Sequence, residues 1–187
     1  MNKTPRSIGP WTVLSETETY ANPWITVTHA EVVTPGATRG VYGTVHFRNL
    51  AIAVLPLDQE RHTWLVGQHR YPLDRYSWEV PEGGCPLGRE DPLATAQREL
   101  KEETGVVARR WDKLLELDMS NSVTDERAIA YVARDLTVGE AEPESTEQLA
   151  VRRVPFIQAY QMVLDGEITD ALSVATILRA QLWLTGI

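Results

Sequence analysis

The 23-residue segment 84–106 constrains the fold most, because it joins two helix boundary signals to a crowded row of acids. Asp91 followed by Pro92 is typical of a helix start, with an N-cap side chain and a proline at the first helical position. Gly105 is a natural C-terminal stop, because glycine readily adopts the left-handed conformation that ends many helices. The segment therefore predicts a helix over residues 92–104, close to the mean length of about 11 residues.

Two faces of this helix differ in character. Three- and four-residue spacings place side chains on one surface, and an apolar stripe at these spacings can pack on a core: Leu93, Ala96 and Leu100. Three carboxylates share the adjacent arc: Glu99, Glu102 and Glu103. Like charges at these spacings repel by a few tenths of a kcal/mol per pair. A divalent cation removes that conflict, since Mg²⁺ binds carboxylate oxygens and keeps positions for water and substrate phosphate.

A solvated acidic face is the alternative interpretation of the same residues. Charged runs of this kind are common on exposed helices, where Arg98 and Glu102 would form an ordinary i,i+4 ion pair. The complete spacing favours the metal site instead. It reads glycine, five residues, glutamate, seven residues, then arginine, glutamate, an aliphatic residue, any residue, two glutamates, any residue, glycine and an aliphatic residue.

This spacing resembles the Nudix box, the signature of the Nudix hydrolase family. The resemblance implies hydrolysis of a diphosphate linkage in a nucleoside diphosphate joined to another group, with Mg²⁺ as cofactor and Mn²⁺ as a substitute. Carried over by position, Glu99 and Glu103 are the expected catalytic metal ligands, and Glu102 is a further ligand. Metal ions in such sites neutralise the diphosphate, lower the pKa of bound water and align the reacting oxygens.

Other box positions carry structural expectations under the same resemblance. Arg98 is expected to pair with a box glutamate, Glu90, and to orient the site. Gly83 and Gly84 are expected to let the loop backbone approach the metal, with the Gly83 carbonyl as a ligand. Cys85 stands where the pattern allows any residue, so it is read as incidental.

Composition agrees with a soluble enzyme. The 187 residues suffice for one full hydrophobic core, and 26 acidic residues against 18 basic ones give a net charge of −8. That balance argues against a nucleic-acid surface, which would show a basic face. One cysteine excludes a disulfide framework, and no targeting segment or long apolar run stands out. We expect a cytoplasmic protein with no membrane partner.

The order of elements predicts a mixed α/β (α+β) fold. It corresponds to the Nudix-type α/β/α sandwich with a mixed sheet, and an N-terminal antiparallel β-region is expected before it. Residues 1–47 would form that region and pair two subunits of a homodimer, and residues 48–187 would form the hydrolase domain. The strands are expected within 11–33, 41–47, 50–57, 61–70, 78–84, 111–119, 127–133 and 149–154, with a turn at 34–36 and an acidic loop at 140–147.

Two further helices are expected over 155–164 and 170–184. In the second, an apolar stripe at helical spacing would pack on a sheet: Ala171, Val174, Ala175, Leu178 and Leu182.

The residues before the box narrow the range of expected substrates. The stretch 67–72, followed by 78–84, is similar to the ADP-ribose and nucleoside-diphosphate-sugar pyrophosphatases of the family. The resemblance implies that Arg70 reaches substrate phosphates and that Glu79 lies at the active site. Guanidinium suits phosphate because it binds two oxygens at once. The alternative for Arg70 is an exposed arginine at a strand end.

Two more candidates lie outside the box. The loop 120–126 resembles the family loop that ends in Asp-Glu, so Glu126 is the candidate for positioning or deprotonating water, with Asp125 second. Asn121-Ser122 stands where relatives often have proline-glycine. The alternative for both acids is an ordinary surface loop, in which polar turn residues are followed by an acid. Trp24 could stack on the nucleobase, although most tryptophans serve as core residues.

These observations predict Mg²⁺-dependent hydrolysis of nucleoside diphosphate sugars. ADP-ribose, giving AMP and ribose 5-phosphate, is the expected substrate, with tolerance for GDP-mannose. Hydrolysis of dinucleotide polyphosphates or nucleoside triphosphates is the alternative within the family. A nucleotide-binding regulator without catalysis is the alternative from another class, although all box glutamates are present.

Overall fold

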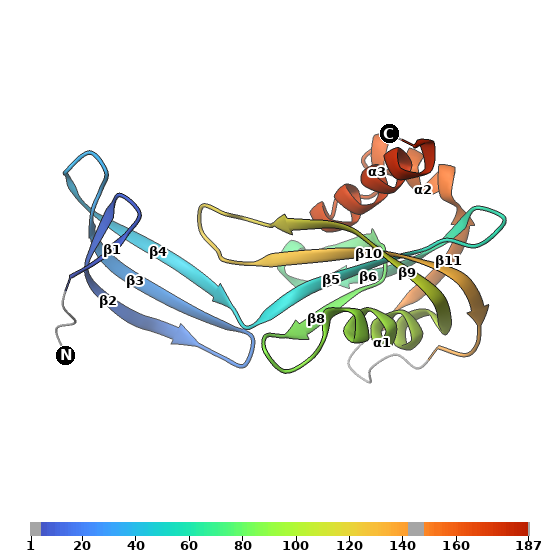
Figure 1. The fold of residues 1–187 in the computed structure, drawn as a ribbon, viewed down its shortest axis with the longest axis horizontal. Coiled ribbons are helices and arrows are strands. Elements are labelled where there is room, and N and C mark those ends of the chain that lie inside the picture. The colour runs from blue at the N-terminus through green and yellow to red at the C-terminus, as the bar shows by residue number, and fades with distance from the viewer. Residues whose placement is uncertain (1–4, 142–147, 187) are drawn as a thin grey trace. The chain divides into compact units, whose positions relative to one another are not determined.

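The computed structural model describes residues 5–141 and 148–186, which divide into two units (Figure 1). The first unit contains the residues up to Asn49 together with Asp118–Glu126. The second contains Leu50–Leu117 together with the residues from Arg127 onward. Each unit has its own β-sheet structure and its own group of buried hydrophobic side chains.

The first unit is built on a four-stranded antiparallel sheet in the order β1-β2-β3-β4. Its strands follow one another along the chain: β1 (Arg6–Ile8), β2 (Trp11–Ala21), β3 (Ile25–Val33) and β4 (Arg39–Phe47). The turn predicted at 34–36 joins β3 to β4, where the Ala37 N–H donates to the Thr34 carbonyl at 2.9 Å. Val13, Ala30 and Val32 form its small buried cluster.

Two sheets form the framework of the second unit. The first sheet has the order β8-β5-β10-β9, and β5 and β10 within it run parallel. The second has the order β11-β6-β7 and is antiparallel. The strands are β5 (Asn49–Pro56), β6 (His62–Arg70), β7 (Arg75–Glu79), β8 (Glu82–Pro86), β9 (Val106–Asp118), β10 (Arg127–Val138) and β11 (Ala150–Pro155).

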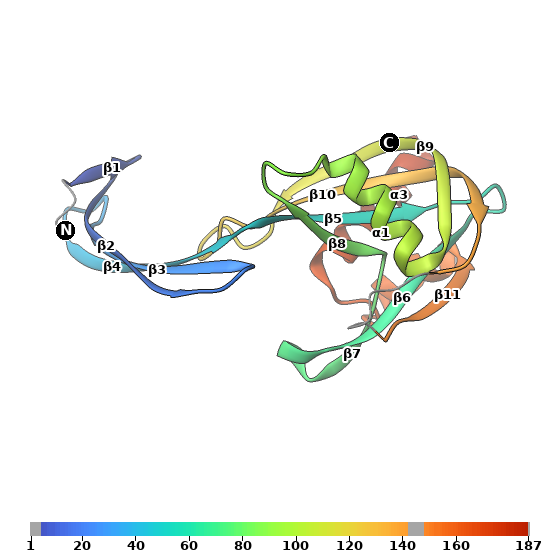
Figure 2. The same cartoon turned by 90° about the horizontal axis from the view of Figure 1, so that it is seen from below.

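Helices cover both faces of the β8-β5-β10-β9 sheet, with α1 on one side and α3 on the other (Figures 1 and 2). The helices are α1 (Pro92–Thr104), α2 (Phe156–Leu164) and α3 (Ala171–Thr185), and a short 3-10 turn, η1 (Tyr71–Leu73), joins β6 to β7. This arrangement confirms the predicted mixed fold class. No helix within the described ranges is both long and apolar enough to cross a membrane.

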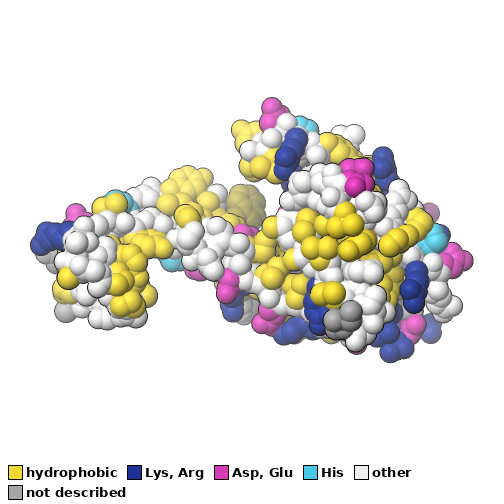
Figure 3. Space-filling model, turned by 90° about the horizontal axis from the view of Figure 1, so that it is seen from above, with side chains coloured by type: hydrophobic (Ala, Val, Ile, Leu, Met, Phe, Trp, Pro, Cys, Tyr) yellow, Lys and Arg dark blue, Asp and Glu magenta, His cyan; other side chains and the backbone are white. Residues whose placement is uncertain are grey.

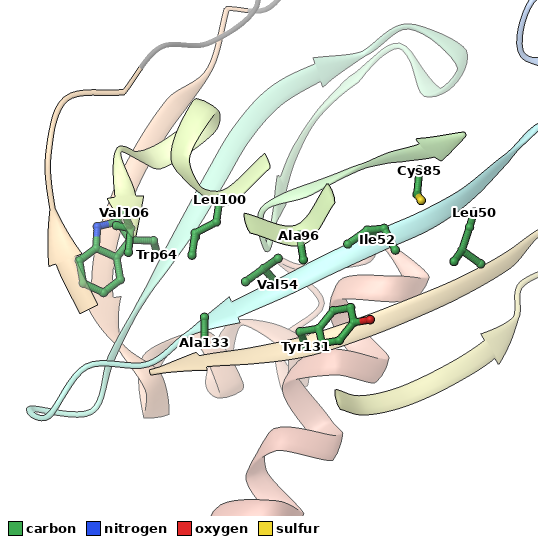
Figure 4. Close-up of a cluster of buried hydrophobic side chains, with 10 residues drawn as sticks. All are labelled: Leu50, Ile52, Val54, Trp64, Cys85, Ala96, Leu100, Val106, Tyr131 and Ala133. Carbon is green, nitrogen blue, oxygen red and sulfur yellow. The ribbon is translucent and has the colours of Figure 1, made fainter. Parts of the chain in front are cut away.

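The main core of the second unit lies between α1 and the sheet (Figure 4). The predicted stripe of α1 faces this core, because Ala96 and Leu100 are fully buried and Leu93 packs beside them. Ile52 and Val54 of β5 meet these helix residues from the sheet. The apolar stripe fixes the rotation of α1, so the adjacent carboxylates are set at the edge of the packed face.

The predicted stripe of α3 is wrong. Leu178 and Leu182 are 37% and 46% exposed, and hydrophobic side chains gather on the face of the second unit where α3 lies (Figure 3). The face that packs inward has a different set of residues: Leu172, Ser173, Thr176, Ile177 and Ala180. Apolar residues surround most of this helix, so periodicity alone could not select the buried side.

The strand predicted over 78–84 is also wrong, because it consists of the end of β7 and the start of β8 in two different sheets. Pro81 lies between them and has no N–H for a strand ladder. Its carbonyl accepts the Val54 N–H at 2.9 Å, which ties the break to β5. Most of the acidic loop expected at 140–147 lies outside the described residues.

Candidate active site

Local signals set the ends of α1 as the sequence indicated. The Asp91 side chain accepts the backbone N–H groups of Leu93 and Ala94, at 2.9 and 3.2 Å, and Pro92 occupies the first turn. Gly105 closes the helix with φ of 71°, and its N–H donates to the Lys101 carbonyl. The predicted helix is therefore confirmed, and its last two turns carry Glu99, Glu102 and Glu103.

Arg98 lies among three box carboxylates. Its guanidinium contacts Glu99 and Glu102 at 2.8 Å each and Glu90 at 3.5 Å. Burial opposes the charge on Arg98, but the hydrogen bond to Glu102 and the nearby carboxylates hold the pKa of Arg98 above its usual value. The pairing with Glu90 expected from the sequence exists, and two more acids share the same cation. Arg98 thus relieves much of the repulsion along this helix.

The burial of Glu99 and Glu103 argues against a simple solvated face. The Glu99 side chain is 14% exposed and Glu103 is 3% exposed. Glu103 accepts the backbone N–H of Glu82 at 3.1 Å, so the first residue of β8 helps to orient it. Burying ionised carboxylates is costly, and a cation bound between two of them would offset part of that cost.

Gly83 lies in β8 rather than in the expected loop, and it leaves the space in which the strand backbone approaches Glu99. A Cβ atom added at Gly83 would lie 2.0 Å from the Glu99 carboxyl carbon, so a side chain fits there only if Glu99 or the backbone shifts. The backbone of β8 therefore approaches the Glu99 carboxylate of α1 closely. Oxygen donors from a helix and a neighbouring strand match the hard ligands that Mg²⁺ prefers, so the residues present fit this cation.

Glu82 and Ser173 were not identified as site residues from the sequence. The Ser173 hydroxyl donates to Glu82 Oε1 at 2.7 Å and accepts the Val80 N–H at 3.0 Å. Burial and the Asp170 carboxylate raise the pKa of Glu82 well above its usual range, against the effect of the Ser173 hydroxyl. A serine within an apolar helix was the only available signal, and it does not identify its partner.

Arg70 and Glu79 form an ion pair across β6 and β7. The pair is bidentate, because Arg70 Nε and Nη2 both donate to the Glu79 carboxylate. Glu79 is 2% exposed, whereas the Arg70 side chain is 38% exposed. Arg70 is therefore more than an isolated surface arginine at a strand end, since a buried carboxylate fixes its direction.

The remaining candidates belong to the first unit. Asp125 Oδ2 contacts His46 Nδ1 at 2.8 Å, and Asp125 Oδ1 accepts the Phe47 N–H at 2.9 Å. Burial would raise the pKa of Asp125, but these hydrogen bonds lower it. Asp125 thus anchors its loop to β4, and Glu126 follows it. Trp24 is 64% exposed, so the alternative of a core tryptophan is wrong.

A second acidic group lies at the turn between β5 and β6. Ligand atoms of Asp58, Glu60 and His62 lie within 4.8 Å of one another. Arg153 donates to Asp58 Oδ2 at 2.9 Å through Nε and to Glu60 Oε2 at 2.7 Å through Nη2. A guanidinium therefore already pairs with both carboxylates of this group, and we assign no metal to it.

Comparison with known families matches most of the chain to two models. The model described as NUDIX domain matches residues 47–175. The model described as nucleoside diphosphate sugar hydrolase N-terminal domain matches residues 11–45. The two matches follow one another along the chain with a single residue between them.

The chain is also similar to individual proteins, two of them by sequence and one by fold. The chain is 33% identical over 138 residues to an ADP-ribose pyrophosphatase of Mycobacterium tuberculosis, covering 73% of this chain and 67% of the relative. It is 35% identical over 134 residues to an ADP-ribose pyrophosphatase of Bacillus subtilis, covering 71% and 72%. A crystal structure of an ADP compounds hydrolase shares the fold, with a TM-score of 0.84, 24% identity and 97% coverage of both chains.

Proposed function

Because the chain belongs to the Nudix hydrolase family, we propose that it hydrolyses the diphosphate bond of nucleoside diphosphate sugars with Mg²⁺ as cofactor. ADP-ribose is the proposed main substrate, giving AMP and ribose 5-phosphate, and GDP-mannose is a proposed secondary substrate. The two ADP-ribose pyrophosphatase relatives and the N-terminal match at 11–45 support this substrate class. Mn²⁺ is the expected substitute cation.

The observation that carries the proposal is the approach of Gly83 to Glu99 beside the buried Glu103. Glu99 and Glu103 would hold Mg²⁺, with Glu102 and the Gly83 carbonyl as further ligands. When bound, the cation would neutralise the diphosphate and lower the pKa of an attacking water. Arg98 keeps the neighbouring carboxylates in place through its three ion pairs.

Substrate contacts are assigned to residues outside the box. Glu79 engages Nε and Nη2 of Arg70, so Nη1 is the nitrogen proposed to donate to a substrate phosphate. Glu126 is the carboxylate proposed to accept a proton from water as the water oxygen bonds to phosphorus. The bridging P–O bond then breaks, and each product keeps one phosphate group. Trp24, with its exposed ring, is proposed to stack on the base.

Residues 1–47 are proposed to pair two subunits, and residues 48–187 to form the catalytic domain. Hydrophobic side chains line a hollow of about 230 Å³ on the sheet of the first unit, where Ile8 and Tyr42 are exposed, and this surface supports a role in assembly. We propose that the protein is a homodimer and that it is cytoplasmic. Size-exclusion chromatography with light scattering would test the dimer.

A product assay tests the proposed activity. The purified protein would be incubated with Mg²⁺ and each of four compounds: ADP-ribose, GDP-mannose, ATP and diadenosine tetraphosphate. Chromatography of the products should show AMP from ADP-ribose, and EDTA should stop the reaction. Turnover of ATP or the dinucleotide alone would replace the sugar proposal with the other family activities. Binding of nucleotides without turnover would favour the non-catalytic regulator.

A further inference from the structure

A buried hydroxyl joins α3 to the break between β7 and β8. Ser173 is 0% exposed, and its oxygen accepts the Val80 N–H at 3.0 Å while donating to Glu82 Oε1 at 2.7 Å. A serine hydroxyl has one proton to donate and lone pairs that accept. One atom of α3 therefore holds the segment 80–82 at both ends.

The same segment also contacts α1. The Glu82 N–H donates to Glu103 Oε2 at 3.1 Å, and Glu103 is almost fully buried. A hydrogen bond to a carboxylate in a buried site fixes the direction of its oxygens. Ser173 and Glu103 are thus joined through three residues of backbone, although 70 positions separate them in the sequence.

We infer that Ser173 is a positioning residue for the metal-binding carboxylate of Glu103. The inference rests on the proposed function only in taking Glu103 as an Mg²⁺ ligand. Ser173 acts through Val80 and Glu82, whose backbone it holds in register with α1. Without the hydroxyl, the buried Val80 N–H loses its acceptor, and the Glu82 side chain loses its donor. The Glu82 N–H then no longer fixes Glu103 in one orientation.

A role in helix packing alone is the competing explanation, and the chain offers a matched control. Thr176 lies one turn further along α3 and is also 0% exposed, but its Oγ1 has no hydrogen-bond partner among the described residues. Thr176→Val removes a buried hydroxyl at nearly constant volume. If only packing on this face mattered, changes at Ser173 and Thr176 would have similar effects on metal binding.

The test measures metal binding without substrate. Mg²⁺ binding by calorimetry and Mn²⁺ binding by electron paramagnetic resonance would be compared for the unaltered protein, Ser173→Ala and Thr176→Val. Ser173→Ala should bind both ions about 10-fold more weakly, the lower end of the range for residues that support metal ligands. Thr176→Val should bind them as the unaltered protein does. Circular dichroism would confirm that each variant is folded.

Each outcome decides the inference. A folded Ser173→Ala that keeps the original affinity overturns it, and so does an equal loss in Thr176→Val. If Ser173→Ala does not fold, Ser173→Cys replaces it, since a thiol is a weaker donor and acceptor. Unchanged affinity in that variant then overturns the inference, and weaker affinity supports it. Absence of metal binding by the unaltered protein overturns it together with the metal site, whereas metal binding without hydrolysis contradicts only the proposed activity.

Discussion

Arg70 donates through Nε to both carboxylate oxygens of Glu79, at 2.9 and 3.1 Å, and Nη2 donates to one of them as well. Hydrogen bonding to Glu79 raises the pKa of Arg70 above its usual value, although burial acts in the opposite direction. The pair joins the end of β6 to the end of β7. A buried carboxylate thus holds a charged guanidinium whose remaining nitrogen can serve a phosphate.

Arg70→Ala should reduce both stability and activity. It leaves Glu79 buried without its partner, which costs about 3 kcal/mol at the lower end of the range for broken buried ion pairs. Loss of a phosphate contact should also raise KM for ADP-ribose about 10-fold. Denaturant titration and steady-state kinetics would measure the two effects. Arg75→Ala is the control, because Arg75 faces Arg70 in the register but is exposed and contacts Thr169. An equal loss in this control would contradict the assigned role.

Glu103→Gln should lower kcat by 10²–10³-fold. Loss of a metal ligand removes about 3–4 kcal/mol of transition-state stabilisation, and each 1.4 kcal/mol is about tenfold in rate. Initial rates at saturating ADP-ribose and Mg²⁺ would test this. Glu116→Gln provides the control, since Glu116 is an exposed glutamate on β9 that pairs with Lys113. The metal site proposed on α1 is wrong if Glu103→Gln keeps the original rate.

Gly83→Ala should weaken Mg²⁺ binding and slow hydrolysis. The added Cβ would lie 2.0 Å from the Glu99 carboxyl carbon, so either the backbone of β8 or the carboxylate must move. A shift near 1 Å at a catalytic group can cost about 100-fold in rate. The dependence of rate on Mg²⁺ concentration would reveal the change. Gly43→Ala is the matched control, because a Cβ at Gly43 meets nothing within 4 Å. Equal kinetics for Gly83→Ala and the unaltered protein would exclude the close approach.

Asp58 should make the second unit more stable at neutral than at acid pH. Burial would raise the pKa of Asp58, but hydrogen bonds from the His62 and Glu60 N–H groups and from Arg153 lower it. The folded state then favours the charged form. This contribution is complete above the unfolded pKa, about 3.9, and is lost as pH falls through the lower folded value.

Thermal unfolding of Asp58→Asn would measure that contribution. At pH 7 the variant should melt about 2–4 °C below the unaltered protein, as expected for a loss near 1 kcal/mol in a chain of this size. The difference should shrink as the pH falls below about 4. Asp74→Asn is the control, since the Asp74 side chain is 98% exposed. A difference that stays constant down to pH 2 would contradict the charge-dependent role of Asp58.

Local signals predicted α1 correctly because they act within a few residues. The cap at Asp91, the stop at Gly105 and the apolar stripe through Leu100 all depend on neighbouring positions along one helix. Because these signals are local, they did not predict the buried face of α3 or the break in the strand expected over 78–84. The helix α3 is apolar around most of its surface, so its spacing did not reveal that Ser173 faces inward. The break at Pro81 likewise separated a stretch that looked like one strand.

The amino-acid sequence by itself determined the helix that carries the box acids, the spacing of those acids and the mixed fold class. These properties follow from backbone geometry and short-range periodicity, which any folded form of this chain must respect. Only the tertiary structure decided that Glu79 holds Arg70, that Glu82 binds Glu103 and that Ser173 reaches Glu82 across 91 residues. Such pairings depend on how helices and sheets pack together, and packing selects among many partners that the sequence leaves equally available.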